Sequence, residues 1–139
     1  MKQRTINKVH ERICRRLRTT HEQVAAKPVQ GMFNFRCHEN CVEYVRRNPD
    51  LNLRIWEAIY IDEGDDPILH YILKDEAAGT FLEVTLGWRA EHLEYYLIRP
   101  LNPDDYPRIH SEFRRSLDHW LEEYVGWFGR KVLGVDRVL

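Results

Sequence analysis

Apolar side chains recur along this chain with two different periods. From Ile6 to Leu17 they follow one another at spacings of three and four residues, which predicts an amphipathic helix within residues 1–26. Between residues 53 and 98 they gather in short runs rich in β-branched and aromatic side chains, the pattern of strands. The helical period returns within residues 103–129. The pattern therefore predicts a sheet flanked by helices.

The central region contains four segments with strand character, at residues 53–61, 68–74, 80–86 and 92–98. The turns between them are short, which favours an antiparallel meander. The predicted fold class is therefore α+β, with a helix and a four-stranded antiparallel sheet within residues 30–100. The amphipathic helix of residues 103–129 is expected to pack on that sheet. Lys-Pro-Val-Gln-Gly at 27–31 predicts a hinge after the first helix.

Composition limits the architecture and the partners. At 139 residues, 43% hydrophobic and 31% charged, the chain fits a single domain, because two domains would each have a marginal core. A formal net charge of −1 argues against a nucleic-acid or membrane-surface binder. No apolar run approaches the roughly 20 residues of a membrane span. Three cysteines and a polar start without an apolar leader indicate a reducing compartment, with the cytoplasm as the default.

The most informative cluster is Cys-His-Glu-Asn-Cys at residues 37–41. Asn34 is the expected N-cap of a helix that runs to about Arg47 and stops ahead of an Asn-Pro pair. Cys37 then lies in the first turn, where the positive pole of the helix stabilises a thiolate and lowers its pKa. Cys41, one turn deeper, is expected to pack as a small apolar residue. From the helix alone, a buried structural cysteine at position 37 is an equal alternative.

A histidine and a glutamate lie on two neighbouring predicted strands. If the hairpin closes with Lys74 opposite Gly79, His70 lies directly across from Glu83 on the same face of the sheet. A carboxylate facing an imidazole fixes the ring tautomer and stabilises its charged form. The alternative is an ordinary cross-strand pair on a solvent-facing surface, with little energetic value.

Short motifs around these residues resemble small papain-like proteins of bacterial and phage genomes, in the cysteine peptidase and transglutaminase-like superfamily. Phe-Arg-Cys-His-Glu-Asn at 35–40, followed by Tyr44, is similar to their nucleophile segment with its Cys-x-x-Asn motif. Ile-Leu-His-Tyr at 68–71 resembles their histidine strand. Phe-Leu-Glu-Val-Thr at 81–85 resembles their acid strand, with glutamate in place of the usual aspartate or asparagine. The similarity covers roughly residues 30–86.

The resemblance implies a papain-like core with a Cys-His-Glu triad. Cys37 would be the nucleophile, His70 the general base and acid, and Glu83 the group that orients the imidazole. The implied activity is a thiol hydrolase or acyltransferase that acts on peptide or amide bonds of a protein or peptide substrate, without metal or cofactor. Amide side chains are implied to support the oxyanion hole and the nucleophile, with the candidates Gln30, Asn34 and Asn40.

Two other classes stay open. One is a non-catalytic phage or bacterial protein that binds and occludes a host macromolecule, with the basic helix of residues 1–26 and the acidic loop 62–66 as contact surfaces. That helix is equally explained as a docking helix with a cationic outer face. The other class is a metal site, although a structural zinc site normally has four ligands in paired short spacings. Its candidate ligands are Cys37, Cys41 and a histidine, His38 or His70.

Overall fold

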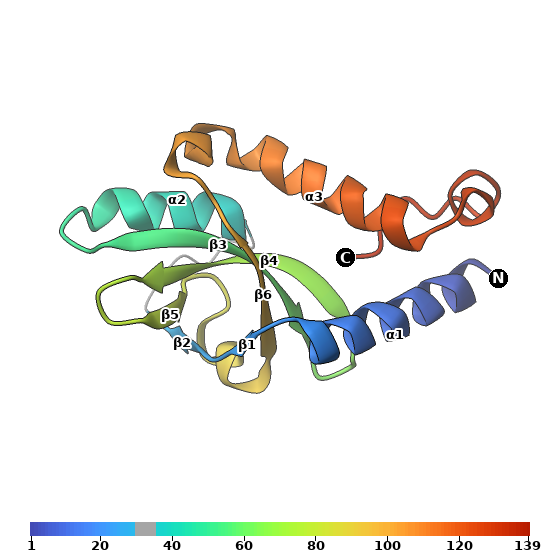
Figure 1. Ribbon diagram of the computed structural model, residues 1–139, viewed down its shortest axis with the longest axis horizontal. Coiled ribbons are helices and arrows are strands. Elements are labelled where there is room, and N and C mark those ends of the chain that lie inside the picture. Colours follow the sequence, from blue (N-terminus) through green and yellow to red (C-terminus); the bar gives the residue numbers. More distant parts are fainter. Residues whose placement is uncertain (30–35) are drawn as a thin grey trace.

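A computed structural model describes residues 1–29 and 36–139 and shows an α+β protein (Figure 1). Three α-helices accompany a six-stranded mixed sheet within the described residues. The helices are α1 (Lys2–Thr20), α2 (Cys37–Arg47) and α3 (Ile109–Tyr124). The strands are β1 (Gln23–Val24), β2 (Ala26–Pro28), β3 (Leu53–Ile61), β4 (Pro67–Asp75), β5 (Thr80–Glu83) and β6 (Glu94–Pro100). Short helices η1 (Gly87–His92), η2 (Pro103–Arg108) and η3 (Phe128–Val132) complete the secondary structure.

The sheet is not the predicted four-stranded antiparallel meander. Its strand order is β1-β6-β3-β4-β5-β2, and β2 runs parallel to β5 while the other neighbours are antiparallel. β1 and β2 stand at opposite ends of this order, yet a single residue separates them along the chain. The segment at 23–28 therefore joins the two ends of the sheet and bends it toward a barrel.

The departure from a meander has a local cause. The strand predicted to reach residue 86 ends at Glu83, and Gly87 has a φ of +60°, a conformation that glycine adopts without strain. The chain then forms η1 and leaves the plane of the sheet. Because β2 already occupies the free side of β5, β6 instead pairs with β3. β6 begins two residues later than predicted.

The N-terminal region also differs from the prediction. The first helix ends at Thr20 instead of continuing to residue 26, and residues 27 and 28 belong to β2 rather than to a hinge. Pro28 is tolerated there because β2 is the last strand of the sheet and needs no ladder on its outer side. The next residue, Val29, donates its backbone amide to the Glu83 carbonyl at 3.0 Å.

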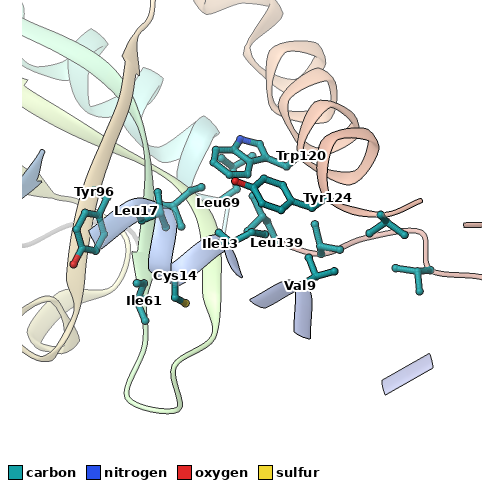
Figure 2. Packing of buried hydrophobic residues seen from close by; sticks show 14 residues of the cluster. Val9, Ile13, Cys14, Leu17, Ile61, Leu69, Tyr96, Trp120, Tyr124 and Leu139 are labelled. Atoms are coloured by element: carbon teal, nitrogen blue, oxygen red, sulfur yellow. The ribbon is translucent and has the colours of Figure 1, made fainter. Parts of the chain in front are cut away.

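All three α-helices cover one face of the sheet. The buried stripe of α1 packs with α3 and with residues of β3, β4 and β6 in one cluster, which Figure 2 shows. Trp120 and Tyr124 of α3 stack at 5.5 Å between ring centroids within this cluster. The prediction that the C-terminal helix packs on the sheet is confirmed, but the helix ends at Tyr124, before residue 129. Within residues 1–29 and 36–139, no helix has the length and apolar character to cross a membrane.

The basic side of α1 faces the acidic loop. Arg18 lies 3.1 Å from Asp65, and His10 lies 3.2 Å from Asp66. Asp62 shapes the loop, since its carboxylate accepts the amides of Gly64 and Asp66. The two surfaces of opposite charge thus contact each other within one molecule, as expected of a docking helix.

Candidate active site

Cys37 is the first residue of α2, as the helix pattern predicts. Arg36 is the N-cap, so the helix begins later than a cap at Asn34 would allow; Asn34 and Gln30 themselves lie outside the described residues. The Cys37 side chain is only 6% exposed. Its backbone amide belongs to the first turn, where helical amides have no intrahelical partner and carry the positive end of the dipole. The helix ends at Arg47, also as predicted.

A gap in the sheet brings Cys37 to β4. The β4–β5 ladder covers only Leu73–Asp75 of β4, while β2 pairs with the other side of β5. Past that point the β5 side of β4 is open, and α2 packs against it. The Tyr71 backbone amide is among the groups that lower the pKa of Cys37. The start of the helix therefore lies against the strand that carries His70.

His70 and Glu83 meet, although not in the predicted register. The ladder pairs Leu73 with Leu82, so Glu83 lies two residues away from the position directly opposite His70. A shift of two residues keeps both side chains on the same face, because side chains along a strand alternate. The His70 Nε2 atom lies 2.7 Å from Glu83 Oε1, and both side chains are almost fully buried.

Glu83 is held by a complete set of donors. Its Oε1 atom accepts the Tyr95 hydroxyl at 2.7 Å, and its Oε2 atom accepts the amides of Thr85 at 2.9 Å and Leu86 at 3.3 Å. Burial by itself raises the pKa of this carboxyl. The charge of His70 and the hydrogen bonds outweigh burial and lower the pKa below its ordinary value. Glu83 is therefore a carboxylate at neutral pH.

Cys37 and His70 form a charged pair. With Nε2 on Glu83, the remaining ring nitrogen of His70, Nδ1, is the one available to the sulfur. Burial opposes a charge on either group. The mutual attraction, with hydrogen bonds to both, outweighs burial, lowers the pKa of Cys37 to about 6 and raises the pKa of His70 to about 10. Between these values the sulfur is a thiolate and the ring an imidazolium.

Asn40 supports the acid from α2. It is 1% exposed, and its side-chain amide donates to the Thr85 hydroxyl at 3.1 Å. Since the Thr85 backbone amide holds Glu83, this bond ties α2 to the turn that fixes the carboxylate. Cys41 is fully buried, and burial raises the pKa of its thiol well above the ordinary value. It packs as a small apolar residue, as predicted.

Three groups near the site are not assigned to it by the sequence. Tyr95 lies on the last strand, and its link to Glu83 depends on a strand order that no local pattern reveals. His38, directly after Cys37, packs against α3, where its Nε2 lies 3.3 Å from Nδ1 of His110. The pattern of residues 103–129 places His110 on the polar side of a helix, which marks no function. The position of His38 next to Cys37 is the only available signal.

Comparison with protein families, with curated proteins and with solved structures finds no match for this chain. Among the described residues, no group of three or more His, Cys, Asp and Glu side chains is arranged to hold a metal ion. The described residues do bring together a cysteine with a lowered pKa, a histidine with a raised pKa and a buried carboxylate bound to that histidine.

Proposed function

We propose that this protein is a papain-like cysteine hydrolase or acyltransferase that acts on peptide or amide bonds. Cys37 is the nucleophile, His70 the general acid and base, and Glu83 the group that orients the ring. The observation that carries this proposal is the buried 2.7 Å contact of His70 Nε2 with Glu83 Oε1. It is supported by the position of Cys37 at the start of α2 and by the charge of His70, which lowers the pKa of Cys37. An activated thiol needs both a lowered pKa and an oriented base, and both are present.

The first half of the reaction forms an acyl-enzyme. The Cys37 thiolate attacks the acyl carbon, so that a carbon–sulfur bond forms and the carbonyl electrons move onto oxygen. We assign the stabilisation of that oxyanion to backbone amides at the start of α2, which have no intrahelical partner. When the tetrahedral species collapses, the carbon–nitrogen bond breaks and the leaving nitrogen takes the proton from His70 Nδ1. The products are a thioester on Cys37, a free amine and a neutral imidazole.

The second half restores the charged pair. Water or an acceptor amine gives a proton to His70 and attacks the thioester, and the carbon–sulfur bond breaks. Water yields an acid, whereas an amine yields a new amide. Glu83 stays ionised throughout, because its donors remain in place; it stabilises the imidazolium and keeps Nδ1 turned toward sulfur.

The test uses an activated ester, because the natural substrate is not identified. The protein is mixed with p-nitrophenyl acetate, nitrophenolate release is followed by absorbance, and intact and peptide masses locate the acetyl group. We expect a burst equal to the enzyme concentration, with one acetyl group on Cys37. Cys37→Ser should abolish the burst. Cys14→Ser is the matched control, since Cys14 is also buried but burial raises the pKa of its thiol.

Two results would contradict the proposal. One is acetylation spread evenly over Cys14, Cys37 and Cys41. The other is a burst that survives Cys37→Ser unchanged. Either outcome would leave Cys37 as a buried structural thiol.

The alternative of a non-catalytic binding protein has less support. It needs the basic helix and the acidic loop as free contact surfaces, yet Arg18 and His10 of the helix pair with Asp65 and Asp66 of the loop. A binding protein also has no use for a charged cysteine–histidine pair. Under that alternative, capture of a partner would survive Cys37→Ala.

A further inference from the structure

His38 is a buried histidine with one unused nitrogen. It lies in the first turn of α2, next to Cys37, and is 8% exposed. Its Nδ1 atom is buried and has no hydrogen-bond partner among the described residues. An unpaired buried ring nitrogen is unfavourable, so its presence beside a nucleophile requires a reason.

Two side chains of α3 hold the His38 ring in place. The ring stacks on Phe113 with centroids 5.0 Å apart and planes at 17°. Its Nε2 atom lies 3.3 Å from Nδ1 of His110, which is exposed at the start of α3. The ring is thus clamped at one face and one nitrogen. Only Nδ1 is left for another contact.

The neighbouring thiol of Cys37, one residue earlier in α2, responds to this ring. His38 is among the groups that lower the pKa of Cys37, after burial, which opposes the shift, and the charge of His70. The other ionisable groups that act on Cys37 or respond to its charge come from three elements around it. They are His70 and Tyr71 of β4, Cys41 of α2 and Tyr60 of β3. Behind His70 stands the Glu83 carboxylate of β5.

The bond between the two histidines selects a tautomer. If His110 donates from Nδ1, then His38 accepts at Nε2 and carries its own proton on Nδ1. That proton points to the unused side of the ring. In the opposite arrangement Nδ1 is a bare acceptor and has no attraction for a negative sulfur. His110 reaches solvent, so it exchanges its proton freely.

We propose that His38 is a positioning residue that stabilises the Cys37 thiolate through its Nδ1 proton, and that His110 holds His38 in the tautomer required. This rests on the proposed function, since it assigns a second donor to the same nucleophile. The sulfur is then held between two histidines of different roles: His70 exchanges a proton with substrate, and His38 does not.

The experiment measures how fast iodoacetamide alkylates Cys37 from pH 4.5 to 9.5, by peptide mass spectrometry on the full chain. Iodoacetamide reacts with the thiolate only, so the midpoint of the profile reports the thiol ionisation. His38→Phe keeps the stacking ring and removes both nitrogens. We expect its midpoint about one pH unit above wild type, with alkylation about tenfold slower at pH 5 and unchanged at pH 9.

Three further variants complete the set. His38→Asn returns a donor close to the Nδ1 position and should recover most of the wild-type profile. His110→Leu should move the midpoint upward by a smaller amount, with alkylation about threefold slower at pH 5. His119→Leu is the matched control on the same helix, since His119 is 70% exposed and pairs with Glu123; its profile should match wild type.

The outcomes separate this inference from the proposed function. If wild-type Cys37 has no low midpoint and reacts no faster than Cys14, the proposed function fails. If wild type has the low midpoint but His38→Phe and His110→Leu superimpose on it, the role of His38 is overturned and the hydrolase proposal stands. If His38→Phe does not fold, as judged by circular dichroism, His110→Leu decides the question: an unmoved midpoint overturns the inference.

Discussion

Two glutamates are equally buried in this protein but pair with different cations. Glu83 of β5 is fully buried and Glu57 of β3 is 1% exposed. They point to opposite faces of the sheet, Glu57 toward the helices and Glu83 away from them. Each accepts a tyrosine hydroxyl. Glu83 accepts that of Tyr95 at 2.7 Å, and Glu57 accepts that of Tyr71 at 3.1 Å. Burial and hydrogen bonding alone do not distinguish them.

The cation beside each carboxylate distinguishes them. Glu57 pairs with Arg99 at 3.2 Å, and Arg99 also lies 3.2 Å from Glu112 on α3. A guanidinium does not give up its proton in a protein, so this cluster only ties β3 and β6 to α3. Glu83 pairs with His70, whose proton can leave and whose pKa also responds to the charge of Cys37. A buried carboxylate becomes part of reactive chemistry when its partner titrates.

The largest expected effect comes from replacing the two cations. His70→Gln removes the main charge that lowers the pKa of Cys37. Burial then dominates and the thiol ionises at or above its ordinary value. Alkylation of Cys37 by iodoacetamide at pH 6.5 should fall at least about a hundredfold. Arg99→Gln should leave this rate within about twofold but lower the free energy of unfolding by about 2–4 kcal/mol, because Glu57 stays buried without its counter-ion.

The measurements are peptide-resolved alkylation and urea unfolding, on both variants at the same pH. The distinction between the Glu57–Arg99 and Glu83–His70 pairs would be wrong if Arg99→Gln slowed the alkylation of Cys37 as much as His70→Gln. In that case the two clusters would act on the sulfur as one network, through Tyr71, whose hydroxyl meets Glu57 and whose amide meets Cys37.

The pH dependence of acyl transfer gives the next largest effect. As pH falls through about 6, Cys37 takes up a proton and the nucleophile is lost; as pH rises through about 10, His70 loses the proton that the leaving group needs. The burst rate with an amide or weakly activated ester should be bell-shaped, with limbs near these values and about a tenfold loss per pH unit beyond them. Alkylation, which needs no general acid, should show the lower limb alone. A single limb for both reactions would contradict the charged pair.

Periodicity predicted much of the fold and the face on which the site lies. β3 begins and ends at the predicted residues, because alternation and β-branched side chains mark it along its whole length. The predicted hairpin register was wrong by two residues, yet His70 and Glu83 still meet. An even shift preserves the face. The face of the sheet to which a strand side chain points is therefore predicted more reliably than the exact register of the hairpin.

Strand order and edge strands could not be predicted from local pattern. β1 and β2 are short, and Pro28 favoured a break, so only their pairing with β6 and β5 makes them strands. The exit of the chain through η1, which places β6 beside β3, depends on that pairing as well. Tyr95 reaches Glu83 only in this order, and His38 acquires a partner only when α3 packs on α2.

Neutralising the glutamates themselves should give a smaller effect than removing the cations. Glu83→Gln keeps most of the hydrogen bonds but removes the charge that stabilises the imidazolium, so the upper limb near pH 10 should move down and the burst rate should fall about tenfold. Glu57→Gln should keep the burst rate and lower the free energy of unfolding by about 1–3 kcal/mol. Equal burst rates in the two variants would show that Glu83 is a structural residue like Glu57.

The two tyrosine hydroxyls give the smallest and most closely matched test. Burial and the adjacent carboxylates raise the pKa of Tyr95 and of Tyr71, so both hydroxyls stay protonated and donate at any pH of interest.

Tyr95→Phe and Tyr71→Phe each remove one donor from a buried carboxylate and should lower the free energy of unfolding by a similar amount, about 1–2 kcal/mol. Tyr95→Phe alone should also change the chemistry, because the Glu83 carboxylate with one donor fewer is more basic and draws more strongly on the His70 Nε2 proton; the burst should slow about threefold. The two variants should therefore lose similar free energies of unfolding, while only Tyr95→Phe has a slower burst. A slower burst in Tyr71→Phe would contradict the assignment of the chemistry to the Glu83 cluster alone.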